Sequence, residues 1–413
     1  MTLSGDNVSS MKHNNRKAVL TEIRLHSSQS RKHLARALHL TPAAISNIVA
    51  ELIEEGLLVE SEPRRAGGVG RSQIMLEINR HARCGLGILI HIGTALISGV
   101  WLDGSSAFSA EVRFPPNAPA QEVVDLLVAQ MQALVEANGL DRRCIVGLGV
   151  AIRGMIDKEK RIVVDSLGVF DGRDIPLAAL FERASGLPVM MDNNVRALFA
   201  AQLFLDCATH SESQFFLRCE YGIGGALSIN DEIWIGGKGH CSEIGHIQVV
   251  RRGGRPCTCG KSGCLETVAS PAAILSEALR IKSPRRTPLL AALAARKPQL
   301  GFDDVVRCAA NGDAGAAYVV ERAVRAMGQA IKSIIYIIDP QRIVLYGNMF
   351  ENDRFLAQLM VELRLGCDKD HEDIIVEKSA YNKLLDPVAA GILSVQRFFA
   401  DGGQGATLTA EAE

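Results

Sequence analysis

Residues 257–264 read Cys-Thr-Cys-Gly-Lys-Ser-Gly-Cys, and residues 243–246 read Glu-Ile-Gly-His. Three thiols therefore fall within eight residues, and the histidine lies eleven residues before the first of them. Three cysteine sulfurs and one imidazole nitrogen complete the tetrahedral coordination of a zinc ion. The glycines allow a tight loop in which the sulfurs converge. Because four protein ligands leave no position for an activated water, we predict a structural zinc ion at His246, Cys257, Cys259 and Cys264.

Two other interpretations of this cluster remain open at the level of sequence. The thiols could form a redox-active pair, or they could be buried and free. Cys241 is close enough in the chain to serve as an alternative ligand. The chain has ten cysteines in all, and those outside the cluster are scattered, which is typical of buried thiols rather than of a disulfide framework.

The wider pattern around these ligands resembles a known family. Glu243-x-Gly-His246, followed by Cys257-x-Cys-Gly-x-x-Gly-Cys264-Leu-Glu266, is similar to the signature of the ROK family (repressors, open reading frames and sugar kinases). Other segments extend the resemblance over nearly the whole chain: the turn after the first lobe at 153–157, the sugar-binding segment at 192–197 and the second phosphate loop at 222–225. The resemblance implies an α/β actin-like, hexokinase-like ATPase fold with two lobes around a cleft, which we assign to residues 83–400.

The resemblance also implies a sugar site. In the family, sugar hydroxyls are held by residues at a strand end, by the Glu and His of Glu-x-Gly-His, and by the Glu after the last Cys. The corresponding positions here are Asn193, Asn194, Glu243, His246 and Glu266. Carboxylates and amides suit vicinal hydroxyls because they accept and donate hydrogen bonds in pairs. Zinc would hold one nitrogen of His246 and leave the other free for a hydroxyl. A structural or surface role remains the alternative for each of the five.

Three departures from the family pattern predict that kinase chemistry is lost. ROK kinases place an aspartate where Asn194 stands, and an amide cannot take a proton from the attacking hydroxyl at neutral pH. Their first phosphate loop, Asp-x-Gly-Gly-Thr, corresponds to residues 88–94, which contain no acidic residue. Their last glycine pair is Gly347-Asn348 here. We therefore predict no catalytic residue, and the change at position 194 also alters a sugar contact.

The segment before residue 83 predicts a winged helix-turn-helix. Apolar spacing predicts helices over 16–26 and 31–38 and a third from Pro42, which Thr41 caps, then strands at 57–60 and 73–78. Small and amide side chains on the third helix suit base edges, and arginines on the glycine-rich hairpin turn suit phosphates or the minor groove. The predicted DNA contacts are Thr41, Pro42, Ala43, Ala44, Ser46, Asn47, Arg64, Arg65 and Arg71. A generic helical subdomain with a solvated basic hairpin is the alternative.

Composition and charge agree with a DNA-binding end. Residues 1–81 hold 11 Lys and Arg against 8 Asp and Glu, whereas the whole chain of 413 residues has a net charge of −1. Aromatic residues make up only 5% of the chain, which argues against an extended stacking surface for single-stranded nucleic acid. We expect a cytoplasmic protein, because no signal peptide or membrane span is apparent. The tail, residues 401–413, has no periodicity and is predicted to be disordered.

Taken together, the chain is similar to the Mlc and NagC type of sugar-responsive repressor within the family. We expect it to repress genes of carbohydrate uptake or metabolism, to bind a double-stranded DNA operator as a homodimer or homotetramer, and to respond to a sugar or sugar phosphate. Two alternatives remain. The chain could be a sugar kinase with a DNA-binding module, or a regulator controlled by a protein partner such as a transporter domain of the phosphotransferase system.

Overall fold

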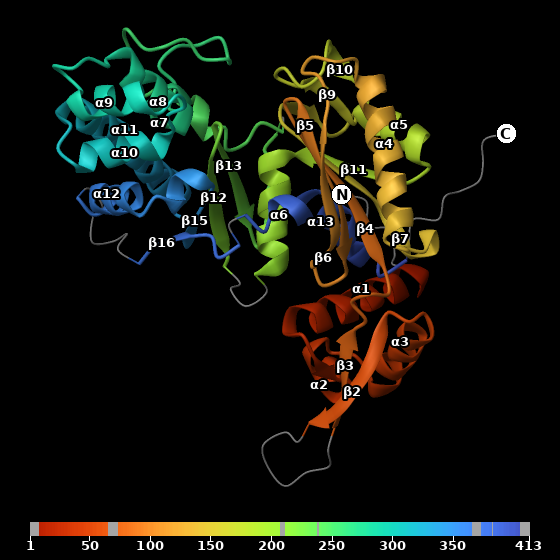
Figure 1. Cartoon of the computed structure of the whole chain (residues 1–413). Coiled ribbons are helices and arrows are strands. Elements are labelled where there is room, and N and C mark those ends of the chain that lie inside the picture. Colours follow the sequence, from red (N-terminus) through yellow and green to blue (C-terminus); the bar gives the residue numbers. More distant parts are fainter. Residues whose placement is uncertain are drawn as a thin grey trace. The chain divides into compact units, whose positions relative to one another are not determined.

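The chain folds into two compact units, seen here in a computed structural model. It describes residues 8–64, 73–206, 211–237, 239–365, 373–381 and 383–404. Unit 1 comprises residues 1–210 and 384–413, and unit 2 comprises residues 211–383. The second unit is thus inserted into the first, and Figure 1 shows the C-terminal blue helix among the elements of unit 1.

The N-terminal part of unit 1, residues 8–78, has the predicted order of helices and hairpin. Its elements are α1 (Val8–His26), β1 (Gln29–Ser30), α2 (Arg31–Ala37), α3 (Pro42–Glu54), β2 (Leu58–Arg64) and β3 (Gln73–Ile78). Ser30 caps α2 and Thr41 caps α3, each accepting a hydrogen bond of 3.2 Å from a backbone N–H. The strands pair in the order β1-β3-β2. Helix α1 begins at Val8, eight residues before the predicted start.

The main sheet of unit 1 has five strands in the order β11-β7-β4-β5-β6. They are β4 (Cys84–His91), β5 (Thr94–Trp101), β6 (Ser106–Arg113), β7 (Ile145–Ile152) and β11 (Val189–Asn193). Strands β4, β7 and β11 are parallel, and Asn193 pairs with Ile152 in register. The carboxyl ends of these three strands therefore meet at one edge of the sheet, where residues that follow them come together.

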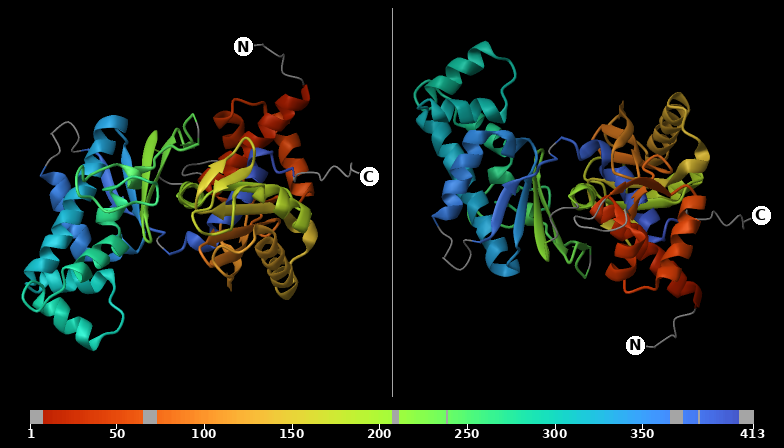
Figure 2. Two further views of the ribbon diagram at one scale, coloured as in Figure 1. Left: turned by 90° about the horizontal axis from the view of Figure 1, so that it is seen from above. Right: turned by 90° about the horizontal axis from the view of Figure 1, so that it is seen from below.

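Helices cover both faces of this sheet. Alternate apolar residues of β4, including Leu86 and Ile88, pack in one core with α4 (Ala120–Ala137) and α5 (Leu177–Ser185). The opposite face contacts α13 (Asp386–Ala400), and α13 in turn packs on α6 (Asn194–Leu205). The approach of α13 is so close that a Cβ at Gly149 would lie 1.7 Å from the carbonyl oxygen of Ala390, which requires glycine there. Figure 2 shows the blue C-terminal helix among the orange and yellow strands from two further directions.

Smaller elements complete unit 1. They are η1 (Arg142–Cys144) and the three-stranded sheet β8 (Met155–Asp157), β9 (Ile162–Asp165) and β10 (Arg173–Ile175).

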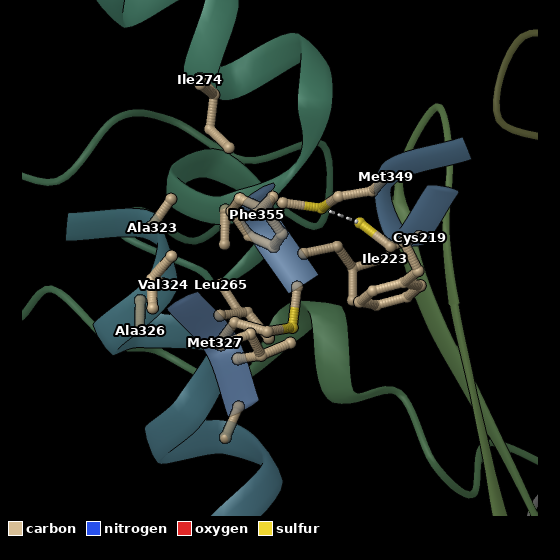
Figure 3. Packing of buried hydrophobic residues seen from close by; sticks show 14 of the residues in the cluster. Cys219, Ile223, Leu265, Ile274, Ala323, Val324, Ala326, Met327, Met349 and Phe355 are labelled. Carbon is tan, nitrogen blue, oxygen red and sulfur yellow. Dashed lines mark hydrogen bonds between the residues drawn. The ribbon is translucent and has the colours of Figure 1, made fainter. Parts of the chain in front are cut away.

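Unit 2 contains a five-stranded sheet in the order β14-β13-β12-β15-β16. The strands are β12 (Ser213–Cys219), β13 (Ile223–Ile229), β14 (Glu232–Trp234), β15 (Arg342–Tyr346) and β16 (Ile375–Lys378). The helices are η2 (Ile244–His246), α7 (Glu266–Ala269), α8 (Pro271–Arg280), α9 (Pro288–Arg296), α10 (Phe302–Ala310), α11 (Ala314–Ile338), η3 (Asn348–Glu351) and α12 (Asp353–Arg364). Figure 3 shows the apolar core, in which Met327 of α11 and Phe355 of α12 pack beside Leu265.

The two units repeat one topology that the sequence does not reveal. In each, three consecutive strands pair antiparallel, a fourth strand pairs in parallel with the first of them, and a fifth strand pairs in parallel with the fourth. This duplication agrees with the two-lobed, actin-like fold implied by the family resemblance. The predicted boundary between residues 82 and 83 falls between β3 and β4, and the predicted domain 83–400 spans parts of both units.

The predicted disordered tail is wrong for its first four residues. The backbone N–H groups of Gly402 and Gly403 donate to carbonyls of the last turn of α13, and both glycines are buried. The carbonyl of Gly402 accepts a hydrogen bond from the guanidinium of Arg16 on α1. Without side chains the two glycines can enter the small space between α13 and α1, which explains why a glycine-rich segment is ordered here. Residues 405–413 lie outside the described residues.

Candidate functional site

The predicted zinc ligands lie on a loop with dense backbone hydrogen bonding. The N–H of Cys257 donates to the carbonyl of Lys261 over 2.8 Å, and the N–H of Gly260 donates to the carbonyl of Cys257 over 3.0 Å. Gly263 has a φ of +73°. A Cβ there would lie 2.1 Å from the carbonyl oxygen of Val250, so only glycine lets the loop close.

The structure brings all four predicted ligands together. The ligand atoms of His246, Cys257, Cys259 and Cys264 lie within 4.8 Å of one another. The sulfurs of Cys259 and Cys264 are 3.6 Å apart, and the Sγ of Cys257 is 3.4 Å from Nδ1 of His246. Two sulfurs on one tetrahedral zinc ion lie about 3.8 Å apart, given a Zn–S bond of about 2.3 Å. The donor set and its dimensions therefore fit a metal ion, whereas Cys241 is not part of the cluster.

Burial and hydrogen bonding shift the pKa values of two thiols of the cluster in opposite directions. Desolvation raises the pKa of the buried Cys264 thiol to about 12. Desolvation acts the same way on Cys259, but hydrogen bonds from the backbone of Lys261 and from the neighbouring thiols outweigh it and lower the pKa of Cys259. Since metals bind thiolates, a metal ion at this site would have to displace the proton of Cys264.

The two ring nitrogens of His246 lie near different groups. Nδ1 lies on the side of the cysteine cluster, and Nε2 lies 4.0 Å from Oε2 of Glu243, whose side chain is 52% exposed. Helix η2 (Ile244–His246) directly follows Glu243, so the short Glu-x-Gly-His segment holds both side chains next to each other. Nε2 is thus available for a ligand while Nδ1 faces the cluster.

Glu266 has a structural contact that the sequence does not indicate. Its Oε2 accepts a hydrogen bond of 3.0 Å from the N–H of Ile223, the first residue of β13 after the turn from β12. A Cβ at Gly222 would lie 2.3 Å from this oxygen, so the glycine makes room for the carboxylate. The turn that resembles a phosphate loop therefore has a carboxylate packed against it. A phosphate would compete there with an existing negative charge.

The two predicted sugar-contacting asparagines lie in unit 1, at the start of α6. Oδ1 of Asn193 caps the helix by accepting from Val195 N–H over 2.8 Å, and its Nδ2 donates to the carbonyl of Gly154 over 3.0 Å. Asn194 is only 4% exposed, and its amide makes no hydrogen bond to the described residues. The structure leaves the sugar role of all five predicted residues as a prediction, with three in unit 2 and two in unit 1.

An ion-pair network surrounds Asp192, the residue directly before these asparagines. The Asp192 carboxylate contacts Nζ of Lys158 at 2.5 Å and accepts from Nε of Arg196 at 2.6 Å. Asp192 and Arg196 are buried, so their charges compensate each other. This network was not predicted from the sequence, although Asp and Arg four residues apart flank the start of α6.

Most predicted DNA-contacting residues are exposed on α3. Thr41, Pro42, Ala43, Ser46 and Asn47 are exposed, while Ala44 is half-buried. Ser46 donates its hydroxyl to the carbonyl of Pro42 over 2.8 Å, so part of its hydrogen-bonding capacity is used within the helix. Arg64 ends β2 opposite Gln73, whereas Arg65 and Arg71 lie outside the described residues.

Arginines of α1 join the N-terminal part to the rest of unit 1. Arg16 is 3% exposed; it donates to the Gly402 carbonyl and pairs with the Glu55 carboxylate directly after α3. The guanidinium carbon of Arg24 lies 4.6 Å from the ring centroid of Phe204, at the end of α6, and Nη1 donates to the Phe204 carbonyl over 3.2 Å. The sequence does not indicate the contacts with Gly402 and Phe204, because these residues lie 386 and 180 residues away from Arg16 and Arg24.

Residues 87–383, which include all of unit 2 and residues 87–210 of unit 1, match the ROK family. The chain belongs to the ROK family. This explains why the cysteine loop, the Glu-x-Gly-His segment and the start of α6 occur in one chain.

Relatives of this ROK chain include regulators. The DNA-binding transcriptional dual regulator NagC of Escherichia coli is 29% identical over 362 residues, which cover 85% of this chain and 84% of NagC. The xylose repressor of Bacillus subtilis is 25% identical over 348 residues, which cover 84% of this chain and 85% of the repressor. A crystal structure described as a ROK family transcriptional regulator, homologue of the E. coli MLC protein, superposes with a TM-score of 0.79 at 24% identity, over 95% of this chain and 98% of that one.

Sugar kinases are also among the relatives of this ROK chain. The glucokinase of Halalkalibacterium halodurans is 30% identical over 222 residues, but these cover only 52% of this chain and 67% of the kinase.

Within the described residues, no helix combines the length and the apolar content needed to cross a membrane.

Proposed function

We propose that this ROK protein is a cytoplasmic transcriptional repressor that binds operator DNA through residues 8–78 and responds to a sugar ligand. The observation that carries the proposal is the extent of the regulator matches. NagC aligns over 85% of the chain, and the Mlc-type structure covers 95% of it, including residues before the family match begins at 87. Both proteins are described as transcriptional regulators, and the N-terminal part has the helix and hairpin order of a winged helix-turn-helix.

In this proposal α3 is the recognition helix. Its exposed N-terminal residues include Ala43, Ser46 and Asn47, which are small or carry an amide. An asparagine amide can contact an adenine edge with two hydrogen bonds, and small neighbours allow the helix to come close. The residues of the hairpin turn, Arg64, Arg65 and Arg71, would add contacts to phosphates or to the minor groove. Two copies of the chain in a homodimer or homotetramer would match a palindromic operator.

We further propose that the cysteine cluster holds a structural zinc ion. Nδ1 of His246 and the three sulfurs would be its ligands, which leaves Nε2 for a ligand hydroxyl. The ion would keep the loop of residues 246–264 folded and the His246 ring fixed. The sugar contacts in this proposal are Asn193, Asn194, Glu243, His246 and Glu266.

The contacts of α6 and α13 supply a physical route from the sugar to the DNA. Helix α6 begins at Asn194 and ends about 16 Å further on, where Phe204 contacts Arg24 of α1. Gln396 of α13 donates to the Ala200 carbonyl of α6. The carbonyl of Gly402, two residues after α13, accepts from Arg16, the partner of Glu55. A ligand that binds more tightly to one position of α6 would thereby favour one position of α1 and α3.

The test begins with the full-length, zinc-loaded chain and a randomised duplex library. Rounds of selection should enrich one palindromic sequence, and Asn47→Ala should weaken binding to it without unfolding the protein. Failure to enrich any duplex sequence would contradict the proposal. The control is Ser333→Ala, which removes an exposed hydroxyl on α11 that bonds only within its own helix.

A sugar kinase carrying a DNA-binding module is the second candidate, and the glucokinase similarity favours it. Asn194 argues against it, because an amide cannot act as the base that a kinase aspartate supplies. ATP turnover measured with glucose, N-acetylglucosamine and N-acetylmannosamine separates the two candidates. Sustained turnover would show that the interpretation of Asn194 is wrong.

A further inference from the structure

We propose that Glu22, His26 and His33 form a second metal site, which takes a divalent transition-metal ion such as Zn²⁺ or Co²⁺ and joins α1 to α2. The site lies in the N-terminal part of unit 1 and shares no residue with the cysteine loop or with the predicted sugar contacts. It depends neither on the proposed DNA-binding function nor on a zinc ion in the cysteine loop.

Two imidazoles from different helices meet one carboxylate oxygen. Nε2 of His26 lies 3.3 Å from Oε1 of Glu22, which precedes it by one helical turn on α1. Nε2 of His33, the third residue of α2, lies 3.6 Å from the same oxygen. Imidazole nitrogens and carboxylate oxygens are common protein ligands of Zn²⁺ and related ions. Two histidines and one glutamate therefore supply three ligands for one ion.

The two distances at Glu22 suit ligands of one ion better than hydrogen bonds. An N–H···O hydrogen bond usually spans about 2.9 Å. With metal–ligand bonds of about 2.0–2.2 Å, two ligands of a tetrahedral ion lie about 3.4 Å apart, which falls between the two observed distances. The distance between the two imidazoles can adjust by rotation of the rings, because the side chains of His26 and His33 are 49% and 50% exposed.

The Glu22 carboxylate lacks a permanent cation. Its side chain is 17% exposed, and no lysine or arginine of the described residues lies within ion-pair distance of it. Arg31, two residues before His33, is held by Glu60 at 2.8 Å. Removing a carboxylate from water without a positive partner is unfavourable. A divalent ion would neutralise Glu22, and the two imidazoles would complete its protein ligands.

The backbone between α1 and α2 sets the three side chains in place. The N–H of Ser28 donates to the His26 carbonyl over 2.7 Å, so the chain turns directly after α1. The N–H of His33 donates to Oγ of Ser30 in the cap of α2, and the next residue, Leu34, is fully buried. An ion bound to the three side chains would therefore fix α1 against α2, which itself contacts α3.

The proposed site differs from the cysteine loop in its number of protein ligands. Three ligands leave the fourth position of a tetrahedral ion to water, whereas His246 and the three clustered cysteines fill all four. The ion at Glu22 should therefore exchange more readily with the medium. Co²⁺ distinguishes the two sites, because cobalt on thiolates absorbs by charge transfer and cobalt on nitrogen and oxygen alone does not.

The test titrates Co²⁺ into the full-length chain, after its cysteine loop has been loaded with zinc and a weak chelator has removed loosely bound ions. We expect one Co²⁺ per chain, with visible d–d absorption and without thiolate charge transfer. A free Co²⁺ concentration of about a hundredfold over the dissociation constant should raise the melting temperature of unit 1 by roughly 5 °C or more. Absorption and scanning calorimetry measure the two effects.

Three variants and one control identify the ligands. His26→Ala, His33→Ala and Glu22→Gln should each weaken Co²⁺ binding by roughly tenfold or more, because even groups that only orient metal ligands change metal affinity by about 10–100-fold. His39→Asn is the matched control. It removes an exposed imidazole between α2 and α3, where a φ of +52° suits asparagine, and should leave the affinity unchanged.

Three results would overturn the second metal site. They are no Co²⁺ bound outside the cysteine loop, absorption that includes thiolate charge transfer, and parental affinity in both His26→Ala and His33→Ala. None of them touches the proposed repressor function, which is tested by duplex selection. Circular dichroism shows which variants fold like the parent chain, and the near-isosteric Glu22→Gln decides the question if a histidine variant does not.

Discussion

The cysteine loop of unit 2 and the junction around α1 in unit 1 are built in opposite ways. All four candidate metal ligands of the loop lie within residues 246–264, and glycines set its turns. The junction joins Arg16 to Gly402, which is 386 residues away, and Arg24 to Phe204. The loop depends on local spacing and an expected metal ion, whereas the junction depends on the packing of the whole unit. Their responses to substitution should differ accordingly.

The largest effect is expected from removing a metal ligand. Cys264→Ser should reduce bound zinc from one ion per chain to none and lower the melting temperature of unit 2 by roughly 10 °C or more, since structural zinc contributes about 10–16 kcal/mol of binding free energy. Metal analysis measures the bound zinc, and the fluorescence of Trp234, in a Trp101→Phe background, measures the melting temperature of unit 2. Cys241→Ser is the control and should keep its zinc. Loss of zinc from Cys241→Ser instead would reassign the ligand set.

A smaller effect is expected at the buried end of the junction. Arg16→Met should lower the free energy of unfolding of unit 1 by about 2 kcal/mol, because it leaves the Gly402 carbonyl and the partly exposed Glu55 carboxylate without their donor. Urea unfolding followed by Trp101, in a Trp234→Phe background, measures this. Lys12→Met breaks an exposed pair with Glu51 and should change stability by less than about 1 kcal/mol. Equal losses of unfolding free energy in the two variants would mean that the buried contacts of Arg16 stabilise unit 1 no more than an exposed ion pair does.

Arg24→Leu should have a more modest effect on stability but a distinct one on regulation. The loss of one cation–π contact and one hydrogen bond to Phe204 should lower the stability of unit 1 by about 1 kcal/mol. If α6 carries the ligand signal, the same variant should reduce the effect of ligand on DNA affinity while ligand affinity changes little. Parallel DNA and ligand titrations measure this. An unaltered response to ligand would remove Arg24 from the proposed route.

The smallest effect on stability is expected on the exposed face of α3. Asn47→Ala should change the free energy of unfolding by less than about 0.5 kcal/mol, because the Asn47 side chain is exposed and makes no hydrogen bond to a described residue. Its DNA affinity should nevertheless fall by about 1–3 kcal/mol on the selected duplex. Anisotropy titrations with the selected and a scrambled duplex test this, and equal affinity of variant and parent would contradict a base contact.

The same contrast explains what could be predicted from the sequence. The ligand spacing of the cysteine loop, the cap at Thr41 and the apolar strands are local, so they could be recognised in advance. The contact of Glu266 with Ile223, the order of Gly402 and Gly403, and the partners of Arg16 depend on long-range packing, which one sequence does not encode in any short window. The repeat of one sheet topology in both units is likewise invisible in the sequence, because strand order is set by long-range pairing.

The most direct test of the account is one titration of the selected operator duplex. Its dissociation constant is measured by fluorescence anisotropy with the full-length, zinc-loaded chain, with and without a saturating concentration of the sugar, among glucose, N-acetylglucosamine and N-acetylmannosamine, that binds most tightly. The account predicts a dissociation constant at least tenfold higher in the presence of the sugar, and a smaller change in Arg24→Leu. An identical dissociation constant with and without the bound sugar would contradict it.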